Sequence, residues 1–166
     1  MTDVPFDPGR ILRTLHGHGV RHVLIGGLAA RVWGSPSITL DADICYARDG
    51  DNLERLAAAL RELGATLRGV HEAVPFQLDA RSLRAGDHLT FMTDAGPLDC
   101  LGVPSGSAGF VELDRNAIDG ELEGVSVRVV DLDDLIRMKR AAGQPKDRIE
   151  LEVLGALRDE LEGRAE

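Results

Sequence analysis

The amino-acid sequence predicts an α/β (α+β) fold, in which a mixed sheet is flanked by helices and followed by C-terminal helices. The chain of 166 residues fits one domain with a substantial core. Its first half alternates short apolar strands with amphipathic helices, a pattern typical of α/β proteins. After residue 130 the apolar residues follow a helical period, so we expect a core over 1–130 and a helical extension over 131–166 packed on the same domain.

Each expected element has a local signal. Asp7 followed by Pro8 is a helix N-cap with proline at the first helical position. Gly64 and Gly143 follow amphipathic stretches and are expected to end their helices. In order, the pattern predicts a helix over 8–17, a strand over 22–25, a short helix after Gly27, a strand over 38–46, a helix over 52–63, a short strand over 65–70, a loop over 71–75, a hairpin over 88–102, a loop over 104–109, a turn over 120–124, a strand over 125–130, a helix over 131–142 and a last helix from Pro145. In the last helix the expected apolar stripe is Ile149, Val153, Leu157 and Leu161.

The strand expected over 38–46 carries two carboxylates on one face. Side chains alternate across a strand, so Asp41 and Asp43 share a face with Thr39. The opposite face, expected to point into the core, is Leu40, Ala42, Ile44 and Tyr46. Aspartate is disfavoured in strands, and paired carboxylates repel each other unless a cation is present. Because hard oxygen ligands suit Mg²⁺ or Mn²⁺, we predict that Asp41 and Asp43 bind such an ion; the alternative is an exposed edge strand.

Gly26 and Gly27 lie where the first strand meets the following helix. A backbone without Cβ lets a phosphate approach closely, and the free N–H groups of a helix N-terminus attract anions. We therefore predict that the two glycines bind the phosphates of a substrate. The alternative is that they only permit tight packing between strand and helix.

Asp99 lies between Leu98 and Cys100 in the second strand of the expected hairpin. A charge buried in an apolar strand is costly unless it has a partner. The residue therefore requires a partner or a function, unless it belongs to a turn instead.

These motifs resemble a known family. Gly-Gly, a spacer of about a dozen residues and then Thr-x-Asp-x-Asp are similar to the first motif of the DNA polymerase beta-like nucleotidyltransferase superfamily. The closest resemblance within it is to the small bacterial AbiEii-like and MNT-like toxin–antitoxin branch, and it extends from residue 22 to about 154. It implies a polymerase beta-like core. Relatives often carry an arginine near the position of Ser37, which this chain lacks.

The resemblance also implies roles for residues outside the first motif. Asp99 matches the third metal ligand of the family. Lys139 matches a lysine that contacts the phosphates of the nucleotide, and Asp147 matches a residue beside the site. From the residues alone, Lys139 is equally a lysine whose stem covers a helix flank, and Asp147 a residue that stabilises a helix N-terminus.

The implied activity is metal-dependent transfer of a nucleoside monophosphate from a nucleoside triphosphate to a hydroxyl group, with release of pyrophosphate. Asp41, Asp43 and Asp99 would then be catalytic metal ligands, with Mg²⁺ or Mn²⁺ as cofactor. The acceptor would be an RNA end or a side chain of a cognate toxin or antitoxin protein, or an antibiotic hydroxyl. A different class of function is a catalytically inactive relative that binds a partner protein.

Composition limits the remaining possibilities. A net charge of −9 argues against a protein that coats nucleic acid. One concentrated run of basic residues could still bind an RNA end. That basic run comprises Arg137, Lys139, Arg140, Lys146 and Arg148. Two cysteines indicate a reducing compartment, and the sequence has neither a membrane span nor a secretion signal, so we expect a cytoplasmic protein. The oligomeric state is left open.

Overall fold

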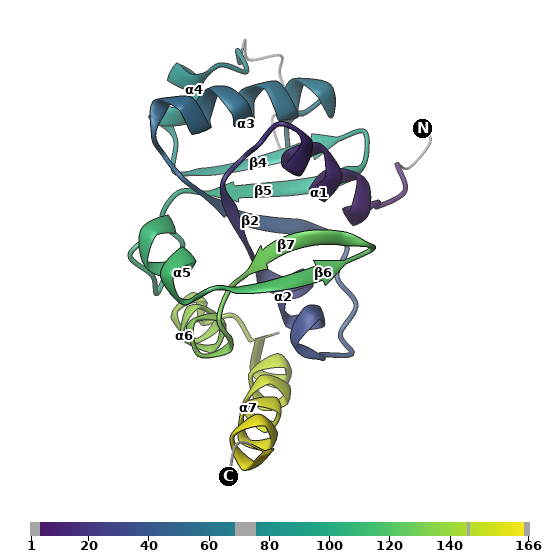
Figure 1. Ribbon diagram of the computed structural model, residues 1–166, viewed down its shortest axis with the longest axis vertical. Coiled ribbons are helices and arrows are strands. Elements are labelled where there is room, and N and C mark those ends of the chain that lie inside the picture. Colours follow the sequence, from purple (N-terminus) through teal and green to yellow (C-terminus); the bar gives the residue numbers. More distant parts are fainter. Residues whose placement is uncertain (1–3, 69–75, 146, 165–166) are drawn as a thin grey trace.

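The computed structural model describes residues 4–68, 76–145 and 147–164. These residues form a seven-stranded mixed sheet with strand order β3-β4-β5-β2-β1-β7-β6, flanked by helices (Figure 1). The strands are β1 (His22–Ile25), β2 (Ala42–Tyr46), β3 (Thr66–Leu67), β4 (His88–Thr93), β5 (Gly96–Leu101), β6 (Ile118–Leu122) and β7 (Val125–Val129). The helices are α1 (Pro8–Gly17), α2 (Gly26–Trp33), α3 (Gly50–Glu62), α4 (Ala80–Ala85), α5 (Phe110–Asn116), α6 (Leu132–Ala142) and α7 (Asp147–Arg164). The predicted fold class is confirmed.

Strand β2 lies in the middle of the sheet. It pairs antiparallel with β1 and parallel with β5. The register places Asp43 opposite Ile25, the last residue of β1, on one side and opposite Asp99 on the other. Helix α2 begins at Gly26, directly after β1. The start of a helix and two acidic side chains therefore come together at one place in the sheet.

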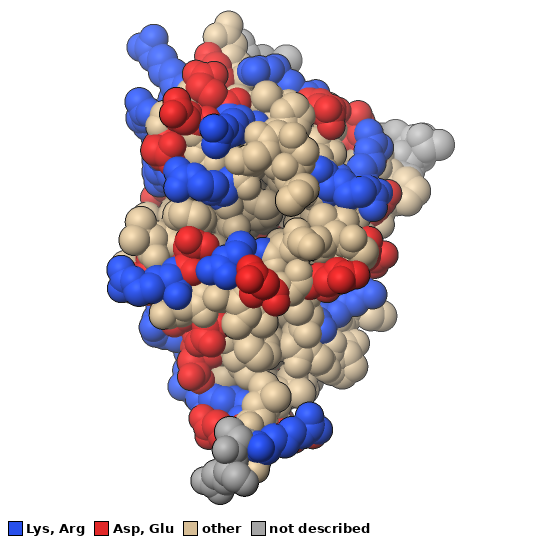
Figure 2. All heavy atoms as spheres, viewed as in Figure 1, with Lys and Arg blue, Asp and Glu red and all other residues tan. Residues whose placement is uncertain are grey.

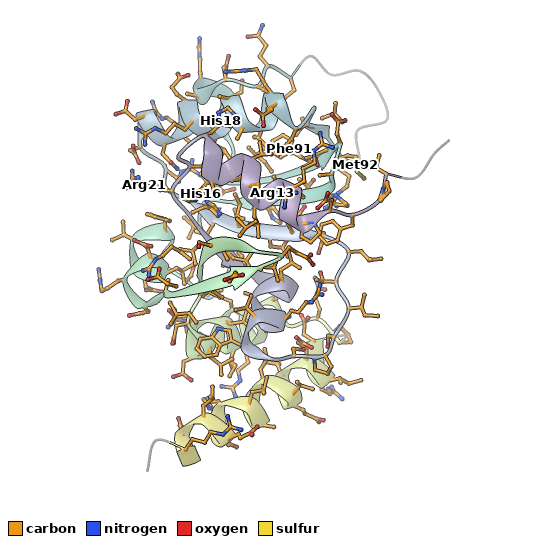
Figure 3. All side chains as sticks on the ribbon, turned by 45° about the vertical axis from the view of Figure 1, so that its right-hand side comes forward. Arg13, His16, His18, Arg21, Phe91 and Met92 are labelled. Carbon is orange, nitrogen blue, oxygen red and sulfur yellow. The ribbon has the colours of Figure 1, made fainter. Side chains whose placement is uncertain are left out.

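Local sequence explains the elements that surround this place. Aspartates begin four helices by accepting a hydrogen bond from a backbone N–H in the first turn: Asp7, Asp49, Asp79 and Asp131. Alternation along β4 shows which of its faces is buried, because Phe91 is fully buried whereas the next residue, Met92, is 38% exposed (Figure 3).

The helices form two groups. Helix α1 packs against α3, and just after α1 the Nε2 atom of His18 lies 3.3 Å from Oε1 of Glu62. Helix α2 packs against α6. Helix α7 contacts α6 and extends beyond it, away from the sheet (Figure 1). No helix in the described part of the chain combines the length and the apolar character that a membrane span needs.

The second strand is shorter than the sequence predicts. It begins at Ala42, and residues 34–41 form a segment without helix or strand. Ile38 and Leu40 are 90% and 71% exposed, so the expectation that Leu40 points into the core is wrong. The alternating pattern continues upstream of the strand, but no neighbouring strand pairs there to hold those residues against the core.

Other differences lie in the second half. Gly120 belongs to β6, not to a turn, and helices α4 and α5 had no clear sequence signal. Helix α7 begins at Asp147, and its apolar stripe is rotated: Leu154 is fully buried, but Ile149 is 73% exposed. The loop expected over 71–75 lies outside the described residues.

Candidate active site

Three carboxylates meet beside the centre of the sheet. Asp43 and Asp99 are direct neighbours on β2 and β5, and Asp41 lies just before β2. One carboxylate oxygen from each of the three lies within 4.8 Å of the other two. The structure thus brings together the three acidic residues that the sequence singled out, although Asp41 is outside the strand.

The two glycines lie against this cluster. Gly26 has a φ of +70°, and a Cβ built on it would lie 2.3 Å from Oδ2 of Asp43. A Cβ on Gly27 would lie 2.8 Å from both Cβ and Oγ1 of Thr39. Glycine is therefore required at both positions by close approach to the site, and at Gly26 also by the backbone conformation. Both glycines also line the cleft described below.

Thr39 links the glycine corner to the acidic cluster. Its hydroxyl group donates a hydrogen bond to Oδ1 of Asp41 at 3.1 Å and contacts the backbone oxygen of the same residue at 3.2 Å. Since the Thr39 side chain also lies against Gly27, the orientation of the Asp41 carboxylate depends on how residues 34–41 are placed.

The cluster carries negative charge that nearby cations only partly offset. Burial, and then the charges of Asp41 and Asp99, raise the pKa of Asp43 to about 8. Burial also raises the pKa of Asp99, although the neighbouring Arg68 opposes the shift. A carboxylate that retains its proton near neutral pH indicates a site where a further cation would be favourable.

Arg68 is a site residue that sequence reasoning missed. Its guanidinium donates a hydrogen bond to Oδ1 of Asp99 at 2.6 Å, and the Asp99 side chain is only 14% exposed. The residue directly follows β3, an edge strand that pairs with β4 through two residues. The pairing of β3 with β4 brings this arginine to Asp99, and that pairing, unlike the β4–β5 hairpin, had no signal in the sequence.

The cluster opens into a cleft of about 790 Å³. This volume lies within the range of small-molecule sites. Its lining includes Gly26, Gly27, Thr39, Asp41, Asp43, Asp87, His88, Asp99, Ser105, Lys139, Gln144, Asp147 and Glu150. All seven residues that the sequence analysis assigned to metal or nucleotide thus line one cleft.

Lys139 and Asp147 occupy the side of the cleft formed by α6 and α7. The Lys139 ammonium lies 3.7 Å from a carboxylate oxygen of Asp147, and the two side chains are 16% and 14% exposed. Lys139 is therefore not a surface lysine that covers a helix flank. It is a cation inside the cleft, with an anion beside it.

Glu150 was also missed. It is a buried carboxylate on α7 that lines the cleft and accepts hydrogen bonds from the hydroxyl groups of Ser35 and Ser37. The sequence pattern of α7 favoured Ile149 as the buried position, and Glu150 was not singled out. Its partners lie more than a hundred residues away, beyond the reach of local patterns.

Much of the basic run is paired. The Arg137 guanidinium contacts Glu112 and Asp134 and donates to the backbone oxygen of Gly106 at 2.7 Å, and Lys139 is paired with Asp147. Lys146 lies outside the described residues. On the face seen in Figure 2, Lys and Arg alternate with Asp and Glu instead of forming a continuous basic surface.

The donor set fits a hard divalent cation. Carboxylate oxygens are the ligands that Mg²⁺ and Mn²⁺ prefer, and three of them converge here around a carboxyl group with a raised pKa. Asp41, Asp43 and Asp99 are the residues that would hold such an ion.

No protein-family model matches the chain, and no curated protein matches it. Solved structures do match. A crystal structure of LnuA, a lincosamide antibiotic adenylyltransferase with lincomycin bound, has a TM-score of 0.62 at 12% identity, over 92% of this chain and 99% of that one. A crystal structure of ANT(2")-Ia in complex with adenylyl-2"-tobramycin has a TM-score of 0.56 at 17% identity, over 96% of this chain and 97% of that one. The chain has the nucleotidyltransferase fold. The similarity covers nearly the whole length of both chains in each comparison.

Proposed function

We propose that this protein transfers a nucleoside monophosphate from a nucleoside triphosphate to a hydroxyl group. The observation that carries the proposal is the convergence of Asp41, Asp43 and Asp99 to within 4.8 Å, beside Gly26 and inside a cleft. In the proposed reaction the acceptor oxygen forms a bond to the α-phosphorus as the bond to the pyrophosphate oxygen breaks, and the hydroxyl proton passes to solvent.

The three carboxylates would hold divalent metal, Mg²⁺ or Mn²⁺, in this proposal. Divalent metal bound there would neutralise charge on the triphosphate and lower the pKa of the acceptor hydroxyl. The N-terminus of α2 at Gly26 and Gly27 gives the phosphates free N–H groups, and Lys139 gives them a positive charge. Asp147 holds the Lys139 ammonium inside the cleft until a phosphate takes its place.

The charge of the cleft bears on which acceptor class we propose. Apart from the triad, Asp87, Asp147 and Glu150 line it, and the basic residues among the described lining are His88 and Lys139. An acidic wall repels a polyanionic RNA end and suits an acceptor that carries hydroxyl and amino groups. An antibiotic-like small molecule is therefore a second candidate beside the toxin–antitoxin acceptors, and both solved neighbours named above were captured with antibiotic-derived ligands.

The toxin–antitoxin context rests on the sequence motifs. In that context the acceptor would be a side-chain hydroxyl of a cognate partner protein or the end of an RNA. Of these two, the acidic lining favours the protein hydroxyl. A catalytically inactive binding module would use the same cleft without turnover.

The test is label transfer. Purified protein is incubated with Mg²⁺ and each α-³²P-labelled nucleoside triphosphate, against cellular RNA, cellular polypeptide and a panel of aminoglycosides and lincosamides. Asp41→Asn removes one triad carboxylate, and Asp51→Asn changes an exposed aspartate of α3 as the matched control.

We expect the unaltered protein and the Asp51→Asn variant to label one acceptor class and to release pyrophosphate, and the Asp41→Asn variant to do neither while unfolding at a similar temperature. Full activity of the Asp41→Asn variant would refute the metal role. Absence of label on every acceptor, together with capture of a partner protein, would identify a binding module instead.

A further inference from the structure

Glu150 is a buried carboxylate whose partners are hydroxyl groups. Its side chain is attached to α7, and the residue is only 8% exposed. Ser35 Oγ donates to its two oxygens at 3.0 and 3.2 Å, and Ser37 Oγ also donates to Oε2. Among the described residues, no Lys, Arg or His lies within ion-pair distance of it. Because a buried carboxylate without hydrogen bonds is costly, the two serines are essential to its placement.

The two serines belong to the segment that carries the first metal ligand. Residues 34–41 lack helix and strand, and the backbone of the segment is anchored to α2 at its start, where Ser35 N donates to Ala30 O at 2.9 Å. The Glu150 contacts follow at Ser35 and Ser37, and Thr39 then contacts Asp41. The hydroxyl clamp of Glu150 is thus the hydrogen-bonded connection between this segment and the C-terminal helix in the described part of the chain.

Resting on the proposed function, we propose that Glu150 is a positioning residue for the metal site. By fixing Ser35 and Ser37, it places Thr39 so that its hydroxyl group orients the Asp41 carboxylate toward Asp43 and Asp99. The C-terminal helix therefore acts at the reaction centre through a segment of the core, not by contact with the metal.

If Glu150 only stabilised the fold, its loss would have a different effect from the one that a positioning role predicts. Helix α7 is also held by Leu154, which is fully buried, and by its packing on α6. Loss of the Glu150 carboxylate therefore leaves the helix in place and releases residues 36–41, which follow the backbone anchor at Ser35. A released segment still carries Asp41, so high metal concentration should recover the assembled site, which a general loss of folded protein would not allow.

The test uses metal binding by the nucleotide-free protein. Mn²⁺ affinity is measured by electron paramagnetic resonance and calorimetry for the unaltered protein, Glu150→Ala, Glu150→Gln and Ser37→Ala, with thermal unfolding of each. Glu152→Ala, at an exposed position of the same helix, is the matched control. Ser37→Ala tests the same clamp should Glu150→Ala fail to fold.

We expect Glu150→Ala and Ser37→Ala to weaken Mn²⁺ binding by roughly tenfold, the low end of the effect of residues that orient metal ligands. The Mn²⁺ affinity of Glu150→Gln should lie between that of these two variants and that of the unaltered protein, because the glutamine amide oxygen still accepts one hydrogen bond. The Glu150→Ala/Ser37→Ala double variant should bind Mn²⁺ no more weakly than Glu150→Ala alone, since that substitution already removes the contact to Ser37. In the transfer assay the Ser37→Ala variant should need more Mg²⁺ but reach the same kcat at saturation.

Failure of this inference can be distinguished from failure of the proposed function. Unchanged Mn²⁺ affinity in Glu150→Ala and Ser37→Ala would overturn this inference and leave the proposed function intact. An unaltered protein that binds no Mn²⁺ would overturn the metal site of the proposed function, and the positioning role with it.

Discussion

Asp43 of β2 and Asp99 of β5 are directly opposite each other in parallel strands, with Asp41 beside them. Parallel pairing places neighbouring side chains on the same side of the sheet, so the two carboxylates cannot turn away from each other without breaking the register. Burial together with this proximity raises the pKa of Asp43 to about 8. The fold thus concentrates negative charge at one point before any ligand binds.

This arrangement predicts that Asp43→Asn stabilises the metal-free protein. The pKa of Asp43 is raised from 3.8 in the unfolded chain to about 8 in the folded one. Between these values the folded state holds a proton that the unfolded state has lost, so the free energy of unfolding falls as pH rises from about 4 to 8. Asparagine does not titrate. In chelator at pH 8, the variant should unfold several degrees above the unaltered protein, since about 1 kcal/mol shifts Tm by roughly 2–4 °C in a domain of this size.

Two comparisons sharpen the stability experiment. At pH 5 the difference between Asp43→Asn and the unaltered protein should shrink, because the folded carboxyl group is then protonated and uncharged. Added Mn²⁺ should raise the Tm of the unaltered protein at pH 8 and leave that of the variant nearly unchanged. A variant that is less stable than the unaltered protein at pH 8 would contradict the charge argument.

Gly26→Ala is predicted to disrupt the metal site. A Cβ at this position would lie 2.3 Å from the Asp43 carboxylate, and the backbone φ of +70° is strained for alanine. Asp43 must move, so we expect loss of Mn²⁺ binding and a lower Tm. Gly155→Ala is the matched control, because a Cβ there meets no atom within 4 Å and alanine is favoured in a helix. Unchanged Mn²⁺ affinity in Gly26→Ala would show that the close approach is tolerated.

The acidic residues of the site could be singled out from the sequence because their signals lie in residues adjacent in the chain. Alternation places Asp41 and Asp43 on one side of an extended segment whether or not that segment is paired as a strand, so the late start of β2, at Ala42, did not matter. Asp99 was singled out because a charge in an apolar strand is unusual, and its place beside Asp41 and Asp43 was implied by the family resemblance. Both signals concern residues adjacent in sequence, and they required no knowledge of how the strands pair.

Arg68 and Glu150 could not be found in this way. Arg68 reaches Asp99 only through the pairing of β3 with β4 and of β4 with β5, and β3 has two residues. Glu150 is buried because residues 34–37 pass over one side of α7, whereas the spacing of apolar residues favoured the side of Ile149. The buried side of a terminal helix depends on which segments pack on it, and these contacts involve residues that are distant in the sequence.

Arg137→Met is predicted to affect stability and not nucleotide binding. Arg137 contacts Glu112 and Asp134, and the Asp134 side chain is only 6% exposed. Removal of the guanidinium leaves a buried carboxylate with fewer partners, which costs about 1–3 kcal/mol in the free energy of unfolding. Urea unfolding measures this loss, and the KM for the nucleoside triphosphate should stay unchanged. A raised KM with unchanged stability would place Arg137 in the nucleotide site instead.

Lys139→Met is predicted to weaken nucleotide binding separately from its effect on stability. The ammonium group lies 3.7 Å from Asp147 in the cleft, so the single substitution leaves that carboxylate without its cation and should lower Tm. The Lys139→Met/Asp147→Asn double variant removes both charges and should recover most of the lost stability.

The KM for the nucleoside triphosphate separates the two effects. Loss of a charge-assisted contact to phosphate should raise it roughly tenfold or more in both the single and the double variant, with Arg140→Met, at the exposed neighbouring position, as control. If the double variant regains both stability and KM, Lys139 serves only to pair with Asp147. If it regains stability alone, the lysine contacts the nucleotide, because the phosphates then lack a cation that the asparagine cannot replace.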